Sequence, residues 1–414
     1  MKRLLLLLSA KTYRAGDFIG AARRLGVEVT VGSDRPHVLA GSGSSGTIAL
    51  DYGDLEGATA QIQALHAAHA FDAVVAVDDA GTRLAARASA ALGLAANPEE
   101  SVVSAANKQV FREVCAAAGL ASPWFKEISL AADPGPLAER MDYPCVLKPV
   151  HLSASRGVIR ADGPAEFVTA FRRIRKLLGQ PEIRERDPGL AQVALVEGFI
   201  PGAEVALEGL VIGGRFELLA FLDKPDPLDG PYFQETLFVT PSRHPLAWQE
   251  RALSAVRAAV EALGLRHGAV HAELRLSERE AVLLELAPRS IGGHCSRMLR
   301  FGTGMTLEEL ILAHALGLAG GVERERPAAG VMMIPIPHAG LLREVQGVEE
   351  AGRVAGIVDV EIAIPPARPV RPPPEGDRYL GFIFARADTP DDAEAALREA
   401  HRRLTVKIDP IAED

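Results

Sequence analysis

The sequence predicts a chain that combines an α/β fold at its N-terminus with α+β folds farther on. Residues 1 to about 100 alternate strand-like and helix-like segments, which is the pattern of a parallel β-sheet. In the middle of the chain, strands follow one another across turn signals, and from about residue 330 onward strands accompany one capped helix. The 414 residues are enough for about three domains.

The first element is expected to be a buried strand. Its apolar run, Leu4 to Leu8, resembles the core of a signal peptide but is shorter than one, and Lys11 follows soon after. A parallel strand that is buried on both faces has the same composition. The alternation continues with GDFIGAARRLG (helix), VEVTVGS (strand), FDAVVAVD (strand) and AGTRLAARASAALGL (helix).

Two features of this region are candidate ligand sites. Asp78 and Asp79 end a predicted strand, where α/β sheets bind ligands, although a turn or helix-capping role explains them equally well. The stretch Gly41 to Gly46, GSGSSG, matches the GxGxxG pattern of dinucleotide-binding loops. It lacks a framing strand and helix and a suitably spaced acidic residue, so we expect a surface loop instead.

The middle of the chain is predicted to contain helices and consecutive strands. Helices are expected at about 107–119, 247–263 and 307–316, and an exposed loop at RERDPGL near residue 187. The expected strands are YPCVLKPV, AQVALVEGFI, AEVALEGLVI, RFELLAFLD, GAVHAELRL and AVLLELAP. Turn signals at Pro201-Gly202 and Gly213-Gly214 separate three of them.

The last part of the chain is predicted to form another α+β unit. GVMMIPIP, VDVEIAIP and YLGFIFAR are expected strands, and PDDAEAALREAHRRL is an expected helix with Thr389 as its N-cap and Pro390 in its first turn. The segment PPARPVRPPPEG is compatible with an SH3-type ligand. A stiff exposed loop between strands is the interpretation that we adopt.

Bulk composition excludes several classes of function. The net charge of −9 argues against a nucleic-acid-binding face, and no run approaches the ~18 apolar residues of a membrane span. Cys115, Cys145 and Cys295 are scattered and lack CxxC spacing, which predicts reduced thiols and no zinc site. We therefore expect a cytoplasmic protein without nucleic-acid or membrane partners.

A pair of carboxylates is the first candidate site for chemistry. Glu273 and Glu285 lie in consecutive strand-like runs, and a hairpin loop of three or five residues would place them directly opposite each other. A loop of two or four residues would place them on opposite faces. Opposed carboxylates repel, and a shared divalent cation such as Mg²⁺ relieves the repulsion. Alternatively, Glu273 pairs with Arg275 or His271 at an ordinary sheet edge.

Further segments suit a nucleotide. Lys148 lies inside an apolar strand and requires an anion, and the segment HLSASRG that follows it supplies hydroxyls, a guanidinium and flexible backbone for a flap over phosphates. The segment is not a GxxxxGK[ST] loop, which excludes a Walker-type NTPase. Glu197 and Glu204 flank a Pro-Gly turn whose free backbone groups can bind an adenine edge, or they are acidic residues on a hydrated strand.

Together these segments resemble a known family. The ordered set NKQVFREVCAAAGLASP with Lys108, LKP with Lys148, VEGFIPGAE, HAELRL and LELAPR resembles the ATP-grasp superfamily of carboxylate–amine ligases over essentially the whole chain. HAE, SASRG and PEGDRYLGFIFARADTP are most similar to the dipeptide-forming L-amino-acid ligases. The resemblance implies an ATP-grasp fold with an N-terminal parallel-sheet domain (1–103), an ATP-grasp region (104–326, with subdomains 104–190 and 191–326) and a C-terminal α+β domain (327–414).

The resemblance also implies roles for individual residues. The implied nucleotide-binding residues are Lys108 and Lys148 at the phosphates, Ser153, Ser155, Arg156 and Gly157 in the flap, Glu197, Phe199 and Ile200 at the adenine, and Glu204 at the ribose. Glu273 and Glu285 would hold Mg²⁺, with Mn²⁺ as an alternative. Arg289 would stabilise the acyl phosphate and the tetrahedral intermediate or hold a substrate carboxylate. Lys224 and His271 are further catalytic candidates.

The implied activity joins a small-molecule carboxylate, which ATP activates as an acyl phosphate, to an amine, with release of ADP and phosphate. Amino acids are the expected substrates and a homodimer the expected assembly. Many ATP-grasp enzymes carry E-x-N on the second metal strand, and the asparagine also binds the metal. This chain has Ala287 at the third position, so the number of metal ions, one or two, is left open. The alternatives are a purine-pathway-like ligase or carboxylase, for which no sugar-phosphate pocket is evident, and a nucleotide-binding module without turnover.

Cys295 beside His294 also fits a Cys–His nucleophile. Adjacent residues on one strand point apart and no orienting acid is evident, so we expect a glycine-rich substrate loop there instead.

Overall fold

The computed structural model of the chain describes residues 1–10, 12–35, 46–185, 187–318, 323–376 and 378–410. Its N-terminal unit contains a parallel sheet with the strand order β3-β2-β1-β4, as the alternating pattern predicted. The strands are β1 (Arg3–Leu8), β2 (Glu28–Ser33), β3 (Gly46–Ala49) and β4 (Ala73–Ala76). Residues 41–45 of the GSGSSG stretch lie outside the described residues, and Gly46 begins β3.

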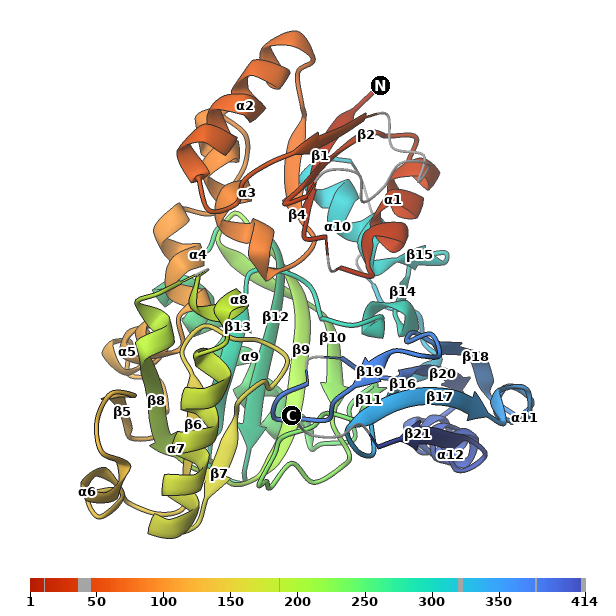
Figure 1. Cartoon of the computed structure of the whole chain (residues 1–414). Helices are drawn as coiled ribbons and strands as arrows, with labels where there is room; N and C mark the ends of the chain where they lie inside the picture. Colours follow the sequence, from red (N-terminus) through yellow and green to blue (C-terminus); the bar gives the residue numbers. More distant parts are fainter. Residues whose placement is uncertain (11, 36–45, 186, 319–322, 377, 411–414) are drawn as a thin grey trace.

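The leucines of β1 are divided between two hydrophobic cores. Leu5 and Leu7 pack with α2 (Leu55–Ala68) and α3 (Asp79–Ala91). Leu4, Leu6 and Leu8 pack with α1 (Ala15–Arg24) and with α10 (Leu307–Ala315), which comes from a much later part of the chain. Figure 1 shows these two helix pairs on opposite sides of the sheet. Burial on both faces explains why this strand has the composition of a signal-peptide core.

A second sheet, which is antiparallel and has the order β5-β8-β6-β7, carries Lys148. Its strands are β5 (Phe125–Ser129), β6 (Cys145–Pro149), β7 (Ile159–Ala161) and β8 (Val193–Gly198). The helix α7 (Pro164–Leu178) packs on it with Phe167, Phe171 and Ile174. The surrounding helical elements are α4 (Glu99–Ala106), α5 (Lys108–Ala117), α6 (Pro134–Ala138), α8 (Pro181–Arg184) and η1 (Leu190–Gln192).

The largest sheet contains strands from both sides of the domain boundary that was expected between residues 326 and 327. Its order is β13-β12-β9-β10-β11-β16-β20-β18, and the neighbouring strands are antiparallel. The first five of these strands are β13 (Ala281–Ala287), β12 (His267–Leu276), β9 (Ala203–Ile212), β10 (Arg215–Asp223) and β11 (Leu237–Thr240). The others are β16 (Ala328–Ile334), β20 (Gly381–Ala387) and β18 (Ile357–Ile362). The helix α9 (Leu246–Ala262) packs against the β12–β13 end of this sheet.

The C-terminal part adds a small antiparallel sheet, β19-β17-β21. Its strands are β17 (Gly340–Gln346), β19 (Pro369–Val370) and β21 (Thr405–Asp409), and the helices are α11 (Val348–Gly352) and α12 (Pro390–Arg402). Thr389 caps α12 as predicted, by accepting the N–H of Asp392. The proline-rich segment (residues 365–376) is not the continuous exposed loop that was expected. Pro369 and Val370 form β19 within it, and Val370 and Pro374 are buried.

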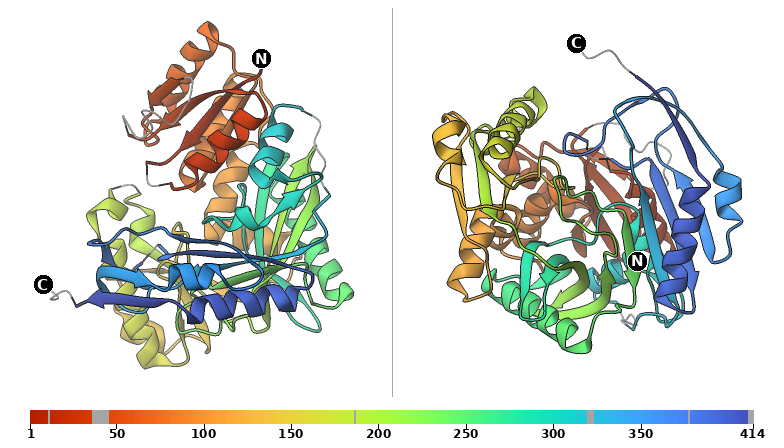
Figure 2. Two further views of the ribbon diagram at one scale, coloured as in Figure 1. Left: turned by 90° about the vertical axis from the view of Figure 1, so that its right-hand side faces the viewer. Right: turned by 90° about the horizontal axis from the view of Figure 1, so that it is seen from below.

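Two short strands and a turn of 3₁₀ helix connect the large sheet to α10. They are η2 (Cys295–Met298), β14 (Arg300–Phe301) and β15 (Met305–Thr306). In Figure 1 and in the left view of Figure 2, the N-terminal unit stands above the other two parts of the molecule. In the part of the chain that the structure describes, the helices are all too short or too polar to cross a bilayer.

The hairpin between β12 and β13 corrects one expectation and confirms another. Its loop has four residues, 277–280, because Leu276 pairs with Ala281, and a four-residue loop was expected to separate the two glutamates. Glu273 nevertheless lies directly opposite Glu285. The register shifts between Leu274 and Glu273, so that Leu284 is the extra residue of a β-bulge. The bulge, rather than the loop length, produces the opposed pair.

Candidate active site

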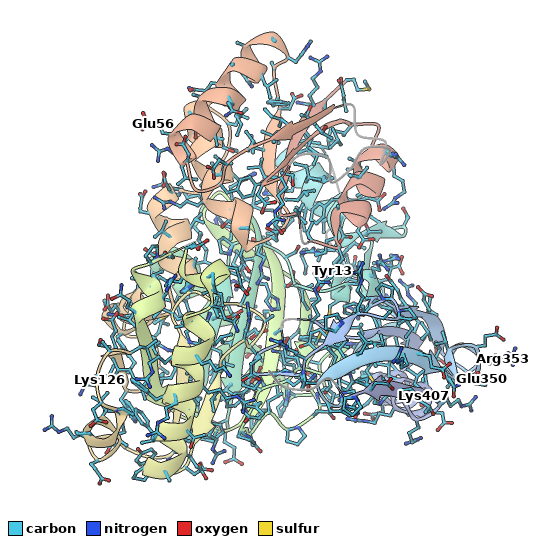
Figure 3. All side chains as sticks on the ribbon, viewed as in Figure 1. Tyr13, Glu56, Lys126, Glu350, Arg353 and Lys407 are labelled. Carbon is cyan, nitrogen blue, oxygen red and sulfur yellow. The ribbon has the colours of Figure 1, made fainter. Side chains whose placement is uncertain are left out.

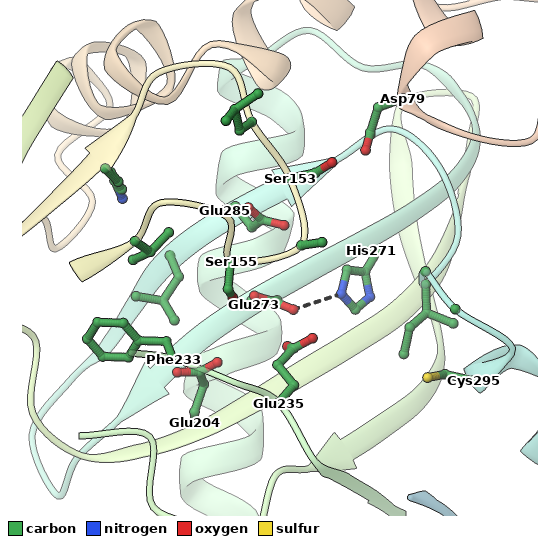
Figure 4. A pocket seen from close by; sticks show the side chains of 18 of the residues that line it. Asp79, Ser153, Ser155, Glu204, Phe233, Glu235, His271, Glu273, Glu285 and Cys295 are labelled. Atoms are coloured by element: carbon green, nitrogen blue, oxygen red, sulfur yellow. Dashed lines mark hydrogen bonds and ion pairs between the residues drawn. The ribbon is translucent and has the colours of Figure 1, made fainter. Parts of the chain in front are cut away.

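A cleft of ≈ 320 Å³ lies where the N-terminal unit, the flap-bearing sheet and the largest sheet meet. Each part of the chain contributes lining residues, and Tyr379 contributes from the C-terminal part. Figure 4 shows the acidic side chains gathered on its floor and Ser153 and Ser155 in the segment across it. Tyr13, labelled in Figure 3, lies between the N-terminal unit and the C-terminal strands. The centre of its ring is 6.2 Å from the centre of the Phe382 ring. The cleft therefore brings together most of the residues that the sequence singled out.

The opposed glutamates on the cleft floor differ in their surroundings. Glu285 is partly exposed, and within the described residues its ion-pair partner is Lys108, with Nζ 3.7 Å from Oε2. Glu273 is more enclosed and has Lys224 Nζ at 2.9 Å and His271 Nε2 at 3.1 Å. The alternative in which Glu273 pairs with His271 is thus also observed. Glu285 faces a second carboxylate and its lysine partner is 3.7 Å away, so it suits a divalent cation.

Lys224 is the centre of a buried charge cluster. Its Nζ lies 2.8 Å from Oε1 of Glu204 and is also bonded to Glu235 and Glu273. Burial opposes its charged form, but the carboxylates outweigh burial and hold the pKa of Lys224 well above its ordinary value. Carboxylate oxygens of the three glutamates lie within 4.8 Å of one another, as in a site that could hold a metal ion, and the ammonium of Lys224 contacts all three. Lys224 lies behind this cluster and not among the lining residues.

Glu235 was missed in the sequence analysis. Burial and the nearby charge of Glu273 raise its pKa to about 8, against the opposing effect of Lys224. It is a single acidic residue two positions before β11, so neither spacing nor alternation marks it. Its side chain reaches the cleft beside Glu204 and Glu273 (Figure 4).

His271 is held between two carboxylates. Its Nδ1 bonds to Glu208, which lies opposite it on β9, and its Nε2 bonds to Glu273. Burial disfavours the imidazolium, but these carboxylates overcome the effect and raise the pKa of His271 to about 9. The ring is therefore charged near neutral pH. Glu208 was also missed, although a carboxylate inside the apolar run VALEGLV is the same signal that marked Glu285.

Lys148 pairs with the buried carboxylate of Glu197, which was expected to contact adenine. Arg112, which is fully buried, donates to both oxygens of Glu197 at 2.8 and 3.1 Å. Burial is the main cause that lowers the pKa of Lys148 to about 8, and Glu197 opposes it. The two cations outweigh burial at Glu197 and lower its pKa to about 2. Glu197 thus supports the lysine, and a direct role at adenine stays a prediction.

The predicted adenine contacts lie at the passage between two sheets. Strands β8 and β9, predicted as neighbours along the chain, belong to different sheets, and Phe199 and Ile200 lie between them. Phe199 stacks on Phe233 with ring centres 6.5 Å apart, and its N–H donates to the carbonyl of Pro144. Glu204, the expected ribose ligand, is held by Lys224 and by Arg275, whose Nε lies 3.0 Å from Oε2.

The expected flap residues divide into two groups. Ser153 and Ser155 line the cleft, and Lys108 Nζ donates to the carbonyl of Leu152 at 2.7 Å. Arg156 and Gly157 are absent from the lining and bond to other parts of the molecule. The expectation that all four face a nucleotide therefore fits the two serines only.

Arg289 enters the cleft from the end of β13 and is held by Asp79. Its Nε and Nη2 lie 2.7 and 3.0 Å from the two oxygens of Asp79. Burial opposes both charges, but each partner favours the charged form of the other, so the pKa of Asp79 is lowered and that of Arg289 is raised. Asp78 accepts from the N–H and hydroxyl of Ser9 and makes no side-chain cap bond to α3.

Cys295 lines the cleft but gains no support as a nucleophile. Burial raises the pKa of its thiol, which keeps it neutral. The orienting acid that was not evident in the sequence is present, because Nδ1 of the adjacent His294 lies 3.1 Å from Oδ2 of Asp17. The other ring nitrogen, Nε2, lies 3.7 Å from Oε1 of Glu361, so both ring nitrogens lie beside carboxylates. All three cysteines are buried and free, as their spacing predicted.

The chain matches three family models along its length. They are the ATP-grasp N-terminal domain at residues 19–95, the ATP-grasp domain at 141–298 and the L-amino acid ligase C-terminal domain 2 at 332–409. The structure superimposes on that of the L-amino acid ligase from Bacillus licheniformis with a TM-score of 0.84, at 26% identity and over 99% of each chain. The expected fold is thereby confirmed.

Curated relatives show more limited similarity. The chain is 26% identical to the alanine–anticapsin ligase of Bacillus amyloliquefaciens over 59% of this chain and 53% of that protein. It is 32% identical to carnosine synthase 1 of Gallus gallus over 40% of this chain and 19% of that protein. The chain thus spans about half or less of the length of these two curated relatives.

Proposed function

Because the chain belongs to the ATP-grasp superfamily, we propose that it is an ATP-dependent ligase that joins a carboxylate to an amine, with amino acids as substrates. The proposal rests on one observation: Glu273 and Glu285 oppose each other in a cleft that also contains Lys148 and Arg289. This combination offers ligands for a divalent cation and positive charge for phosphate oxygens within one site. The similarity to ligases that act on amino acids supports the choice of substrate.

The proposed reaction has two steps. An oxygen of the substrate carboxylate attacks the γ-phosphorus of ATP, and the bond to the β-phosphate oxygen breaks to give an acyl phosphate and ADP. The amine nitrogen then attacks the acyl carbon and loses a proton, and inorganic phosphate leaves. Mg²⁺, held by Glu273 and Glu285, would neutralise charge on the phosphate oxygens.

The protein side chains have distinct tasks in this scheme. Lys108 and Lys148 bind phosphate oxygens, and Arg289 donates to the oxygen that becomes negative when the amine attacks. The segment with Ser153 and Ser155 excludes water, which would otherwise hydrolyse the acyl phosphate. Asp79 fixes the orientation of the Arg289 guanidinium through two parallel hydrogen bonds.

The substrates and the turnover are tested together. Phosphate release from Mg-ATP is measured with the purified protein across single amino acids and pairs of amino acids, and the products are identified by mass spectrometry. Release that requires a particular pair, together with an amide product, is the expected result. ATP binding without phosphate release for any pair would contradict the proposal and favour a nucleotide-binding module. The variant Lys148→Met serves as the control for contaminating ATPases. A homodimer stays a prediction that light scattering can check.

A further inference from the structure

The segment across the cleft, residues 152–157, is called the flap here, and its two sides have different partners. Ser153 and Ser155 face the cleft, whereas Arg156 and Gly157 bond to a segment of the C-terminal part. The N–H of Gly157 donates to the carbonyl of Pro374 at 2.9 Å, and Nε of Arg156 donates to the carbonyl of Glu375 at 3.1 Å. We call residues 371–376 the strap. The flap and the strap are more than 200 residues apart along the chain. One backbone N–H and one side chain of the flap donate hydrogen bonds to carbonyls of the strap.

The side chain of Glu375 fastens the strap to the body of the protein. Both of its oxygens accept hydrogen bonds from Arg173 of α7, with Nη2 2.8 Å from Oε2. Arg173 also bonds to the hydroxyl of Tyr232 and lies 5.1 Å from its ring centre. One arginine therefore joins the strap to α7 and to the loop between β10 and β11. A two-pronged pair of this kind fixes geometry better than a single contact does.

The backbone of the flap requires support from outside. Ala154 and Ser155 have φ of 58° and 53°, a left-handed conformation that non-glycine residues adopt at a cost in free energy. Gly157 has φ of 76°, and a Cβ there would lie 2.8 Å from Cγ of Pro149. Such a conformation persists only when surrounding contacts hold it. The strap bonds at Arg156 and Gly157 supply contacts directly after the two left-handed residues.

We propose that the strap holds the flap in position over the cleft and that Glu375 and Arg173 are positioning residues of the reaction. The identity of the enclosed ligand rests on the proposed function. Tyr379, which follows the strap closely in the chain, lines the same cleft as Ser153 and Ser155 of the flap. Loosening the strap leaves the catalytic groups in place but lets water reach the acyl phosphate. The cost then falls on product yield per ATP more than on ATP consumption.

The first test is independent of turnover. Hydrogen exchange of peptides covering residues 150–160 is compared between wild type and Glu375→Gln, which keeps the strap carbonyls but weakens the pair with Arg173. The matched control is Glu344→Gln, which removes the exposed pair with Lys407 at the outer edge of the C-terminal part (Figure 3). We expect about threefold to tenfold faster exchange in the flap for Glu375→Gln alone. Equal exchange in both variants would overturn the inference.

The second test uses an amino-acid pair that the wild type joins. The ratio of phosphate released to amide formed is expected to rise at least severalfold in Glu375→Gln and in Arg173→Gln, and to remain unchanged in Glu344→Gln. The reversed pair Arg173→Glu with Glu375→Arg is expected to restore part of the coupling. An unchanged ratio in an active enzyme would contradict the inference alone. If the wild type joins no pair, the proposed function fails, and hydrogen exchange still decides whether the strap holds the flap.

Discussion

Asp79 and Arg289 form a two-pronged ion pair that joins the N-terminal unit to the cleft, with N–O distances of 2.7 and 3.0 Å. The two residues are separated by 210 positions in the sequence. Asp79 begins α3 directly after the first sheet, and Arg289 follows β13 of the largest sheet. The N-terminal unit thereby contributes to the orientation of a proposed catalytic group.

The variant Asp79→Asn should lower kcat by about tenfold or more and leave the KM for ATP nearly unchanged. The amide cannot accept from both arms of the guanidinium, so Arg289 loses its fixed orientation. Arg289→Ala should show the same pattern more strongly. Asp72→Asn, which removes contacts with Lys2 and Arg3 elsewhere in the same unit, is the control. Steady-state kinetics that are alike for Asp79→Asn and Asp72→Asn would contradict the positioning role.

The variant Glu285→Gln should raise the Mg²⁺ concentration for half-maximal activity by about tenfold or more. Replacing one of two opposed carboxylates by an amide weakens one ligand and removes half of the charge that attracts the cation. Glu285 is a cleaner target than Glu273, which also bonds to Lys224 and His271. Glu280→Gln, in the exposed hairpin loop, is the control. A Mg²⁺ titration that does not change in Glu285→Gln would refute the metal assignment.

Nucleotide binding should weaken as the pH rises above about 8. Burial lowers the pKa of Lys148 to about 8, so the lysine loses its proton, and with it the attraction for phosphate, as the pH increases through that value. At one pH unit above the pKa only about a tenth of the lysine is charged, which allows up to roughly tenfold weaker binding. The variant Lys148→Arg keeps its charge and should flatten the profile. Calorimetric measurement of the ATP affinity from pH 7 to 9.5 tests this prediction. A wild-type affinity that does not change with pH would contradict it.

The variant Arg112→Met should destabilise the fold by about 3–5 kcal/mol, because it leaves the buried Glu197 carboxylate with Lys148 as its remaining cation. The double variant Arg112→Met with Glu197→Gln should recover part of the loss. Arg403→Met, on the exposed end of α12, is the control and should change little. Scanning calorimetry measures the midpoints, and equal shifts for Arg112→Met and Arg403→Met would contradict the role of Arg112.

Local patterns predicted most secondary structure and part of the site. The period-two alternation in β12 and β13 identified Glu273 and Glu285 as strand residues, and burial arguments identified Lys148 as needing an anion. These inferences succeed because a charged residue inside an apolar run carries an energetic cost that the sequence displays by itself. The prediction of opposed glutamates was right for a different reason from the one expected, since a bulge at Leu284 offsets the four-residue loop.

The sequence by itself thus determined the elements, the parallel N-terminal sheet and the charged residues embedded in strands, because these depend on neighbours one to four positions away. Tertiary structure alone decided which charges meet. Glu235 joins Lys224, Asp79 holds Arg289, and the strap carrying Glu375 reaches the flap. Glu235 and Glu375 are single charged residues in loops, and no periodicity marks them. Their partners are selected by the packing of sheets and helices that are distant in the chain, and the free energy of each pair depends on the burial that this packing creates.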